Sequence, residues 1–441
     1  MLTLFNLYLM KTKHSFWGRY FPLLIILSAI ISACDSSTLS GDDPSGGPGG
    51  SQGTGWNKDQ PNNVILYKTN TGTIISREPV KWRNYIYFAY GENEEVANIV
   101  SNTYSEEGIG KIVFDKDLRA IASGAFFNSK YLTSISIPSG VTEIGAHAFE
   151  GCSSLTSINI PSSVTEIGKY AFDECTSLTS ISIPSGVTEI GEYTFYKCTS
   201  LTSISIPSGV TEIGYATFAE CKSLTSIDIP SGVTTIGYDA FSGCSSLTSI
   251  SIPSGVTTIG YYAFAECTSL TSVNIPSSVT EIEYSAFRGC TSLTSISIPS
   301  GVTEIGEYTF EGCSSLTSID IPSSVTTIGR SAFSGCTSLT SINIPSSVTE
   351  IGRGAFEGCS SLTSITFPSS VTTIGDYALE GCYSLISVTI LAQTPPLCGD
   401  LLPSGWDWWD DLIIYVPSES VDAYKSAWPK YADRDRIQPI Q

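Results

Sequence analysis

The sequence predicts a solenoid, a fold in which short coils of similar sequence stack along one axis, and three observations lead to it. One phrase recurs every 23 residues from Cys152 onward without an insertion. Each copy places its apolar residues at the same positions, so stacked copies can bury them in one continuous core. Each copy also contains two short extended segments separated by proline and glycine, which predicts mostly β-structure.

The repeat is counted from its cysteine, which takes position 0. In most copies Leu stands at +3, Ile at +6, +8 and +15, Pro at +9, Val at +12, Gly at +16, Ala at +19 and Phe at +20. Degenerate copies begin near Glu106 and at Ser129, and a fragment begins at Cys382, so about 12 repeats and the fragment occupy residues 106–390. The ten regular copies begin at Cys152, Cys175, Cys198, Cys221, Cys244, Cys267, Cys290, Cys313, Cys336 and Cys359.

One copy shows how each coil is expected to fold. Residues 157–160 alternate polar and apolar, which predicts a strand with both isoleucines facing inward. Pro161 ends this strand because proline has no N–H for the ladder. Residues 164–167 predict a second extended segment, after which Gly168 permits a tight turn. Tyr170–Phe172 is expected to form a single helical turn on the far side of the coil.

The N-terminal residues predict export. An apolar run at 21–31 follows several basic residues and is too short for a stable transmembrane helix, which predicts a signal peptide over residues 1–33. Its end, Ile-Ser-Ala before Cys34, resembles the bacterial lipobox, which implies a lipid on Cys34 that anchors the mature chain to a membrane. Ordinary signal cleavage with Cys34 incidental is the alternative, and both Met1 and Met10 remain candidate starts.

The segments on either side of the repeats do not follow the period. Residues 34–58 have too few apolar side chains to fold and predict a flexible tether. Residues 59–105 hold three predicted strands, near Val64, Thr73 and Tyr85, and are expected to cap the open end of the core. A small ligand-binding module is the alternative for that segment. Residues 391–441 predict a C-terminal cap with a strand at 412–417 and a helix at 420–428.

The charge and the composition exclude some functions. The chain has 22 Lys and Arg against 42 Asp and Glu, a net charge of −20, which argues against a nucleic-acid partner. Only 15% of its residues are charged while Ser, Thr and Gly are abundant. This hydroxyl-rich composition suits an extracellular or envelope protein.

No arrangement of residues predicts an enzyme. His147 is the only histidine after the signal peptide, so a serine triad would have to be built around it, in a variable surface column. Glutamates recur at +14 and are interpreted as a solvated stripe without a convergent acid-base pair. No glycine-rich phosphate loop occurs. The chain is therefore predicted to be non-enzymatic, without a cofactor or a metal.

Eleven of the 13 cysteines, Cys152 to Cys382, share one column. Disulfides between neighbouring coils are one interpretation for an exported protein. However, parallel side chains have the wrong relative orientation for that bond, and four sulfurs in parallel coils cannot converge on zinc. We expect buried free thiols that fill a small apolar slot.

The order L-x-x-I-x-I-P-x-x-V-x-x-I-G-x-x-A-F-x-x-C resembles the BspA-type leucine-rich repeat of bacterial cell-surface proteins and lipoproteins. The ending Tyr-Val-Pro followed by Val-Asp-Ala-Tyr-Lys resembles that family as well. The resemblance implies a curved leucine-rich repeat solenoid, mostly β with short helical turns, with a parallel sheet on its concave face. It also implies adhesion to host matrix proteins or to other cells. With the acidic residues after Cys34, it suggests an outer-membrane lipoprotein that is exposed on the cell surface.

Two surfaces are candidate binding sites for an extracellular protein or glycan. Columns +5 and +7 should point outward from the sheet and are rich in hydroxyls, which could equally serve only solubility. A tyrosine stripe at +17 and +18 offers rigid apolar area with a polar tip, although its rings could simply shield the core. The concave-face candidates are Asn159, Asp228, Asn274, Asp320 and Asn343, and the aromatic candidates are Tyr170, Tyr193, Tyr215, Tyr238 and Tyr261.

Two further features lie outside the regular repeat pattern. Trp406, Trp408 and Trp409 form a loop that could stack on a glycan or plug the last coil. Glu283 replaces the turn glycine at +16, and we expect its coil to be locally distorted. The function expected is adhesion through repeated surface faces, and the alternative is a surface lipoprotein that captures glycans.

Overall fold

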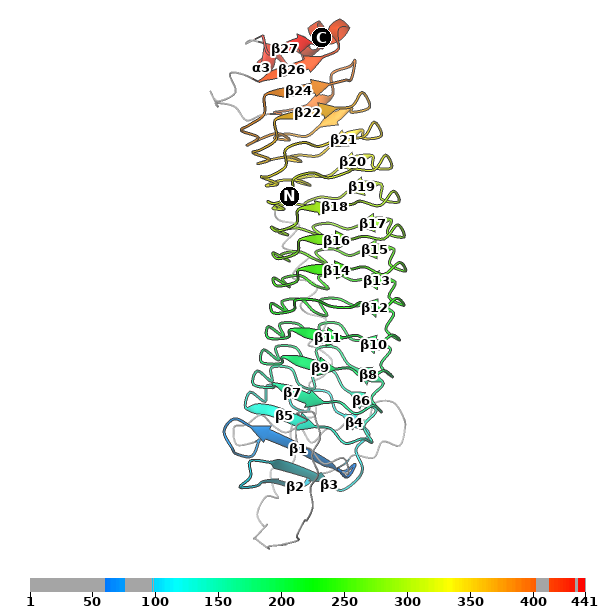
Figure 1. Cartoon of the computed structure of the whole chain (residues 1–441), viewed down its shortest axis with the longest axis vertical. Coiled ribbons are helices and arrows are strands. Elements are labelled where there is room, and N and C mark those ends of the chain that lie inside the picture. The colour runs from blue at the N-terminus through cyan, green and yellow to red at the C-terminus, as the bar shows by residue number, and fades with distance from the viewer. Residues whose placement is uncertain (1–59, 76–96, 98, 402–411, 433–434, 441) are drawn as a thin grey trace, which may run out of the picture. The chain divides into compact units, whose positions relative to one another are not determined.

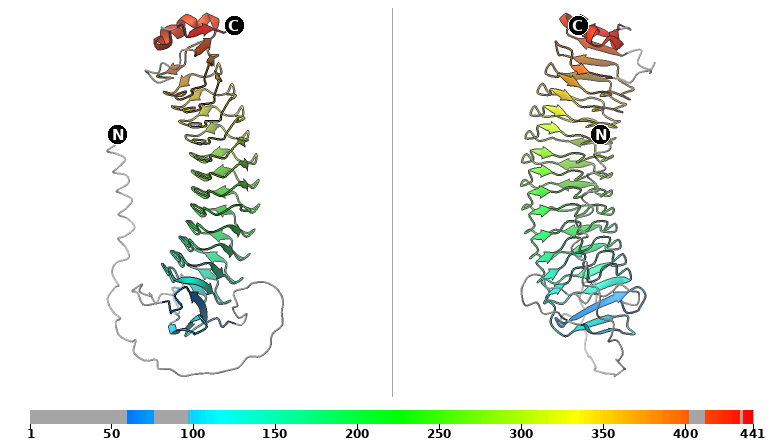
Figure 2. Two further views of the ribbon diagram at one scale, coloured as in Figure 1. Left: turned by 60° about the vertical axis from the view of Figure 1, so that its left-hand side comes forward. Right: turned by 180° about the vertical axis from the view of Figure 1, so that it is seen from behind.

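The repeats form the predicted solenoid. The structure is a computed structural model and describes residues 60–75, 97, 99–401, 412–432 and 435–440. Residues 55–441 belong to one compact unit, in which the coils stack along one axis in a gently bowed column (Figures 1 and 2). About 13 turns of parallel-strand solenoid with very little helix confirm the predicted fold class.

The first strand of a coil lies at +5 to +7, and most of these strands pair in parallel register with a neighbouring coil; no pairing is assigned between residues 157–159 and 180–182. Ser134, Ile135 and Ser136 pair with residues 157–159 of the next coil, so residues 23 apart in sequence lie side by side. Isolated bridges at Asp228, Asp320 and Asn343 continue this sheet where no strand is assigned. Its strands are β5 (Leu132–Ser136), β7 (Ser157–Asn159), β9 (Ser180–Ser182), β11 (Ser203–Ser205), β14 (Ser249–Ser251), β16 (Ser272–Asn274), β18 (Ser295–Ile296), β22 (Ser364–Phe367) and β24 (Ser387–Ile390).

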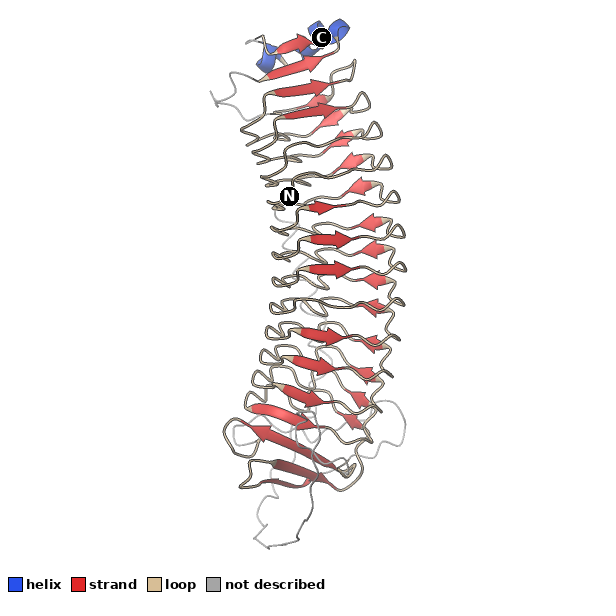
Figure 3. Ribbon diagram, in the orientation of Figure 1, coloured by secondary structure: helices blue, strands red, loops and turns tan. Residues whose placement is uncertain are grey.

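The second strand lies at +14 and +15 and builds a second parallel sheet, visible in Figure 3 as another column of short arrows. In the strands from Glu143 to Ile374 the isoleucine at +15 is buried and the residue at +14 faces outward. The strands are β4 (Ala120–Ile121), β6 (Glu143–Ile144), β8 (Glu166–Ile167), β10 (Glu189–Ile190), β12 (Glu212–Ile213), β13 (Thr235–Ile236), β15 (Thr258–Ile259), β17 (Glu281–Ile282), β19 (Glu304–Ile305), β20 (Thr327–Ile328), β21 (Glu350–Ile351), β23 (Thr373–Ile374) and β25 (Leu397–Cys398).

The third side of each coil differs from the helical turn expected at Tyr170–Phe172. It is a run of turns, and no helix is assigned within the described repeats. Alternate N–H groups leave their own coil: Tyr170 N donates to Glu192 O at 3.0 Å and Phe172 N to Thr194 O at 2.9 Å. Tyr170 and Glu174 have φ of 59° and 55°, so left-handed residues interrupt any helix. Bonding between coils therefore replaces bonding within a helix.

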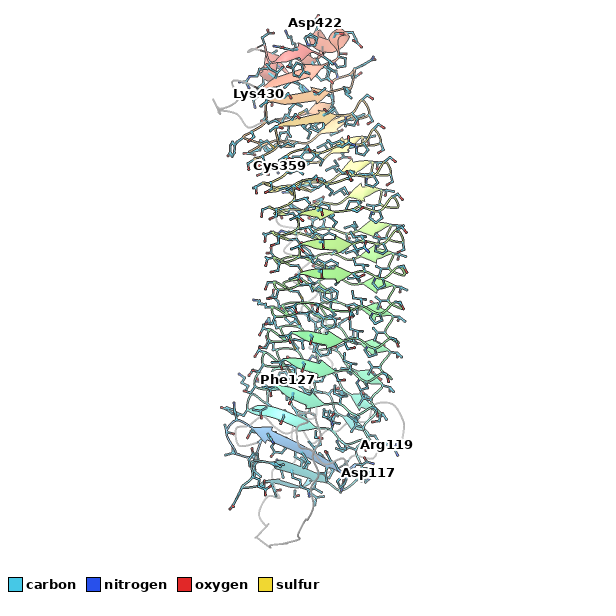
Figure 4. All side chains as sticks on the ribbon, viewed as in Figure 1. Asp117, Arg119, Phe127, Cys359, Asp422 and Lys430 are labelled. Atoms are coloured by element: carbon cyan, nitrogen blue, oxygen red, sulfur yellow. The ribbon has the colours of Figure 1, made fainter. Side chains whose placement is uncertain are left out.

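The interior is built from stacked columns of identical residues. The phenylalanines at +20, from Phe126 to Phe356, stack with ring centroids 5.2–5.8 Å apart and nearly parallel planes. Beside them each cysteine thiol donates to a phenylalanine carbonyl of an earlier coil, as from Cys152 to Phe126 O at 3.1 Å. Cys359, labelled in Figure 4, is fully buried.

The cysteine column holds free thiols, as predicted. All twelve cysteines of the described residues are unpaired with one another. Burial raises the pKa of the Cys152 thiol to about 12. Since the thiolate is the reactive form, these groups are structural filling and chemically inert at neutral pH.

The N-terminal part contains a strand exchange that the repeat does not predict. β1 (Val64–Thr69) lies antiparallel between β5 and β3 (Gly110–Phe114), and β2 (Ile99–Tyr104) pairs with β3. β1 therefore separates the first two coils in this sheet. The predicted strand near Thr73 is absent, and the one near Tyr85 lies outside the described residues.

The C-terminal end continues the first sheet and then covers it. β26 (Ile413–Val416) pairs with β24, and β27 (Ile437–Pro439) pairs with β26. The predicted helix at 420–428 is confirmed as α2 (Val421–Ala427), preceded by the 3₁₀ turn η2 (Ser418–Ser420) and followed by α3 (Pro429–Ala432). Tyr424 donates its hydroxyl to Ala392 O at 2.7 Å, and Lys430 pairs with Asp400 at 2.9 Å. These two contacts hold the C-terminal helices against the last coil.

Candidate binding surfaces

The tyrosine stripe is a continuous ladder of rings. Neighbouring rings lie 4.6–6.3 Å apart between centroids, from face-to-face stacking at its start to tilted and edge contacts further along. All five tyrosines predicted from the sequence belong to it. We call this set the aromatic ladder: His147, Tyr170, Tyr193, Tyr215, Tyr238, Tyr261, Tyr284 and Tyr308.

The ladder is half exposed, and burial raises the pKa of several of its tyrosines, which keeps these phenols neutral at physiological pH. Tyr238 is 38% and Tyr261 is 44% exposed, whereas the phenylalanine stack beneath is fully buried. Burial, followed by the charge of Glu307, raises the pKa of Tyr284 to about 12. The guanidinium of Arg330 lies 5.4 Å from the ring centroid of Tyr308 and extends the ladder by a cation–π contact. The phenol groups can therefore both donate and accept hydrogen bonds.

The hydroxyl-rich columns form a second surface, which we call the hydroxyl face. Its five predicted candidates, Asn159, Asp228, Asn274, Asp320 and Asn343, are all exposed in one column. Most of the threonines at +4 beside them are engaged in the fold, since they donate their hydroxyls to the threonine carbonyl one coil earlier, as from Thr156 to Thr133 O at 3.0 Å. The face thus combines structural threonines with exposed polar side chains.

The second sheet is interrupted at two junctions between coils, β10 to β12 and β17 to β19. At closed junctions the N–H at +16 donates to the isoleucine carbonyl at +15 of the preceding coil, as from Gly237 to Ile213 at 2.8 Å. Among the described residues the equivalent bonds from Gly214 and from Gly306 are missing. We call these two places the open junctions.

A threonine at +19 accompanies each open junction. Most coils have alanine there, but Thr217 and Thr309 are buried and donate their hydroxyls to the carbonyls of Gly214 and Gly306 in their own coils, at 3.0 and 2.9 Å. A buried hydroxyl needs an acceptor, and this one holds the turn to its own coil. Thr194 at the same position accompanies a lengthened bond of 3.3 Å to the preceding coil. Thr217 and Thr309 were not identified from the sequence, although departure from alanine is a readable signal.

The distortion predicted for the coil of Glu283 occurs on only one side of that coil. Its own N–H keeps the bond to Ile259 O at 2.9 Å, and the ladder opens on the far side of its coil, toward Gly306. The other open junction follows a coil with glycine at +16, Gly191. The threonine at +19 is therefore the feature that both open junctions share.

Each open junction contains a cleft. The Lys169 cleft has a volume of about 500 Å³ and is lined by Lys169, Glu189, Glu192 and Glu212 among others. The Tyr261 cleft has a volume of about 390 Å³, and none of its lining residues is basic. Its functional side chains are Tyr261, Glu281, Glu283, Tyr284, Glu304 and Glu307.

The carboxylates of the Tyr261 cleft repel one another. Burial, followed by the charge of Glu281, raises the pKa of Glu283, and the charge of Glu304 adds to the shift. The Tyr284 hydroxyl donates to Glu307 Oε2 at 3.3 Å and so holds one carboxylate beside an aromatic ring. The cleft is a site of concentrated negative potential between two tyrosines.

Several other residues predicted from the sequence to be functional lie outside these clefts or outside the described part of the chain. Cys34, Trp406, Trp408 and Trp409 lie outside the described residues. His147 pairs with Glu150 within the ladder. The described residues contain no group of three or more His, Cys, Asp or Glu that could hold a metal ion. None of the helices in the described part has the length and apolar character required to cross a membrane.

Comparison with known proteins identifies the family. The profile described as the BspA type leucine-rich repeat region matches residues 97–224, 165–294, 211–336 and 280–396. Together these ranges cover more than half of the chain, which therefore belongs to the BspA-type leucine-rich repeat family. No match was found among curated proteins.

Several solved structures are similar to this chain. A leucine-rich repeat protein from Bacteroides ovatus is 32% identical, with 77% of this chain and 90% of that chain covered and a TM-score of 0.53. A leucine-rich cell surface protein from Faecalibacterium prausnitzii is 29% identical, with 70% and 88% covered and a TM-score of 0.40. The pneumococcal vaccine antigen PcpA is 21% identical, with 77% and 85% covered and a TM-score of 0.49. The class of protein is thus a bacterial repeat scaffold of the kind that supports protein interaction.

Proposed function

We propose that this protein is an adhesin-like lipoprotein of the bacterial cell envelope that binds an extracellular protein through its aromatic ladder. The observation that carries the proposal is the ladder itself: eight rings in contact along successive coils, with Tyr238 and Tyr261 exposed. Tyrosine contributes much interface energy for little loss of side-chain entropy. The core does not require these rings, because the phenylalanine stack already fills it.

The arrangement favours many similar contacts over one pocket. Each coil presents nearly the same ring at nearly the same spacing, so a partner that spans several coils gains avidity from weak, repeated contacts. The net charge of −20 disfavours acidic partners. The same geometry would suit an extended protein segment that lies along the stack.

Anchoring and display are part of the proposal. Cys34 carries the lipid, residues 34–58 serve as the tether, 59–105 and 391–441 as caps, and 106–390 as the binding array. The name of the Faecalibacterium relative, a cell surface protein, agrees with exposure on the cell. Palmitate labelling that is lost in Cys34→Ala, together with protease shaving of intact cells, tests anchoring and display.

The experiment for adhesion replaces four rings outside the Tyr261 cleft. Tyr170, Tyr193, Tyr215 and Tyr238 are changed together to serine, a residue that already occupies the stripe in other coils, as at Ser285 and Ser331. Binding to an array of matrix proteins and glycans should fall by about tenfold or more, since hot-spot aromatics carry most interface energy. The matched control changes Ser157, Ser180, Ser203 and Ser226 of the same coils to alanine and should bind as wild type.

The array also decides between the two candidate ligands. A protein ligand whose binding depends on the four rings supports adhesion. Binding only to glycans, with loss in Trp406→Ala, Trp408→Ala or Trp409→Ala, would favour glycan capture and contradict the proposal. Far-UV circular dichroism and the melting temperature verify that each variant is folded.

A further inference from the structure

We propose that the Tyr261 cleft binds a basic side chain, lysine or arginine, of a protein partner. The proposal deepens the proposed function, since it names the chemistry of one contact on the scaffold. It rests on the open junction, on the two tyrosine rings and on a second cleft in the same molecule that a lysine of this chain already serves.

At the closed junctions from Gly145 to Gly375 the N–H at +16 donates to the isoleucine carbonyl of the preceding coil, and the open junction lacks this bond in the described part of the chain. No hydrogen bond joins Gly306 N to Ile282 O, or Thr303 N to Thr280 O, among the described residues. The Ile282 carbonyl therefore lies at a cleft wall as an acceptor without its usual partner. Buried or half-buried carbonyls favour a donor, and an ammonium or a guanidinium supplies several.

The Lys169 cleft is the internal counterpart of the Tyr261 cleft. The two lie four repeats apart, so that Lys169, Glu189 and Glu212 correspond to Tyr261, Glu281 and Glu304. In the first cleft Lys169 Nζ pairs with Glu192 at 2.9 Å. A cation of the chain itself thus pairs with one of the three carboxylates there.

The Tyr261 cleft has more negative charge and lacks that cation. Four glutamates line it, against three glutamates and a lysine in its counterpart. The nearby Arg288 is engaged with Glu311, at 2.5 Å from Nε to Oε2. The site is therefore complementary to a cation supplied from outside.

Two positions that hold Lys169 and Glu192 in the first cleft hold tyrosine in the Tyr261 cleft. These tyrosines make the cleft suitable for an organic cation. Tyr261 and Tyr284 have their ring centroids 6.3 Å apart and present aromatic faces and edges at the cleft. Aromatic faces attract ammonium and guanidinium groups, and carboxylates beside them complete the recognition. A volume of about 390 Å³ accommodates one long side chain.

The test uses a single cation, so that the overall negative charge of the protein contributes little. The full chain carries ¹³C-labelled tyrosine and is titrated with N-acetyl-lysine-N-methylamide in about 150 mM salt, where long-range attraction is screened. The signals of Tyr261 and Tyr284 should shift in a saturating manner. The Nε-acetylated form of the same compound, which has no charge, should cause no shift.

Two variants test the assignment. Tyr261→Lys supplies the chain's own cation, as Lys169 does in the other cleft, and should abolish the shift of Tyr284. Glu283→Gln with Glu304→Gln keeps the shape, removes two charges and should weaken binding about tenfold. Ser369→Lys adds the same charge at an exposed turn position away from the cleft and is the matched control, expected to bind as wild type.

The outcomes separate this proposal from the proposed function. A non-saturating response, or one unchanged in both cleft variants, would overturn the lysine site. Loss of the shift with array binding intact supports the site and shows that adhesion does not depend on it. Melting temperatures of the variants near that of wild type show that a loss of binding is not a loss of fold.

Discussion

The closed and open junctions of the second sheet have nearly the same sequence and differ in structure. Between β13 and β15 the strands pair in register, Thr235 with Thr258 and Ile236 with Ile259. Between β17 and β19 no pairing is assigned, and a cleft takes its place. The residue at +19 is Ala263 in the β15 coil and Thr309 in the β19 coil.

The difference shows how little is needed to create a site in a uniform array. Glycine at +16 allows the coils to approach so closely that a Cβ on Gly260 would lie 2.7 Å from the backbone of Gly237. At Gly306 a Cβ would instead meet its own Thr309 hydroxyl at 3.3 Å, with the preceding coil further away. A buried hydroxyl at +19 thus accompanies the loss of backbone contact at both open junctions, whereas at Thr194 the same hydroxyl accompanies a lengthened bond and the strands stay paired.

The largest effect is expected in the interior, which both kinds of junction share. Phe241→Ala and Phe287→Ala should each lower the stability by about 3–5 kcal/mol, because the ring stack passes through open and closed junctions alike. Urea denaturation followed by circular dichroism measures the loss. A much smaller loss for Phe287→Ala would mean that the open junction extends into the core.

Conversion of a closed junction into an open one should have the next largest effect. Ala240→Thr adds a hydroxyl and a methyl group at a fully buried position and should cost about 1–3 kcal/mol. Amide hydrogen exchange at Gly237, whose N–H now bonds Ile213 O at 2.8 Å, should accelerate. Retained protection of that amide would contradict the role given to threonine.

The reverse change should close an open junction. Thr309→Ala restores the common residue at +19 and should stabilise the chain by about 1 kcal/mol as bonds to the preceding coil form. Exchange at Gly306 should slow to the rate of Gly329, which already bonds Ile305 O at 2.8 Å. Gly329 thus serves as the internal reference, and an unchanged rate at Gly306 would refute this account.

The smallest effect concerns pH. The raised pKa of Glu283 means that the folded state binds a proton at a higher pH than the unfolded state does. Stability should therefore rise as the pH falls through the folded pKa toward about 4.5 and decline again with increasing pH. The contribution of this half-buried group is below about 1 kcal/mol. Melting temperatures between pH 8 and pH 5 should rise less in Glu283→Gln than in wild type; equal rises would exclude this contribution.

The structural features that could be predicted from the sequence are those that recur in every coil. Alternation at 157–160 predicted the first sheet, and the cysteine column predicted buried thiols, since eleven identical positions must share one environment. The aromatic ladder was also readable, because Tyr170 and Tyr193 stand one period apart. His147 was missed as a ladder member, since a single histidine has no repeated counterpart.

Two features of the fold could not be predicted from the repeat pattern. β1 inserts between β3 and β5, a pairing between distant segments that no local pattern specifies. The turns that replace the expected helix depend on bonds to the next coil, which one repeat considered alone does not include. Both are decided by neighbours in space.

The sequence by itself determined the period, the two strands of each coil and the inward columns, because hydrophobic burial acts identically on identical copies. Only the tertiary structure decided where the copies cease to be equivalent. Close approach of backbones at +16 leaves little room between coils, and the second sheet is open in front of Thr217 and Thr309, between Glu189 and Glu212 and between Glu281 and Glu304. Packing between coils therefore converts a small change in sequence into a cleft.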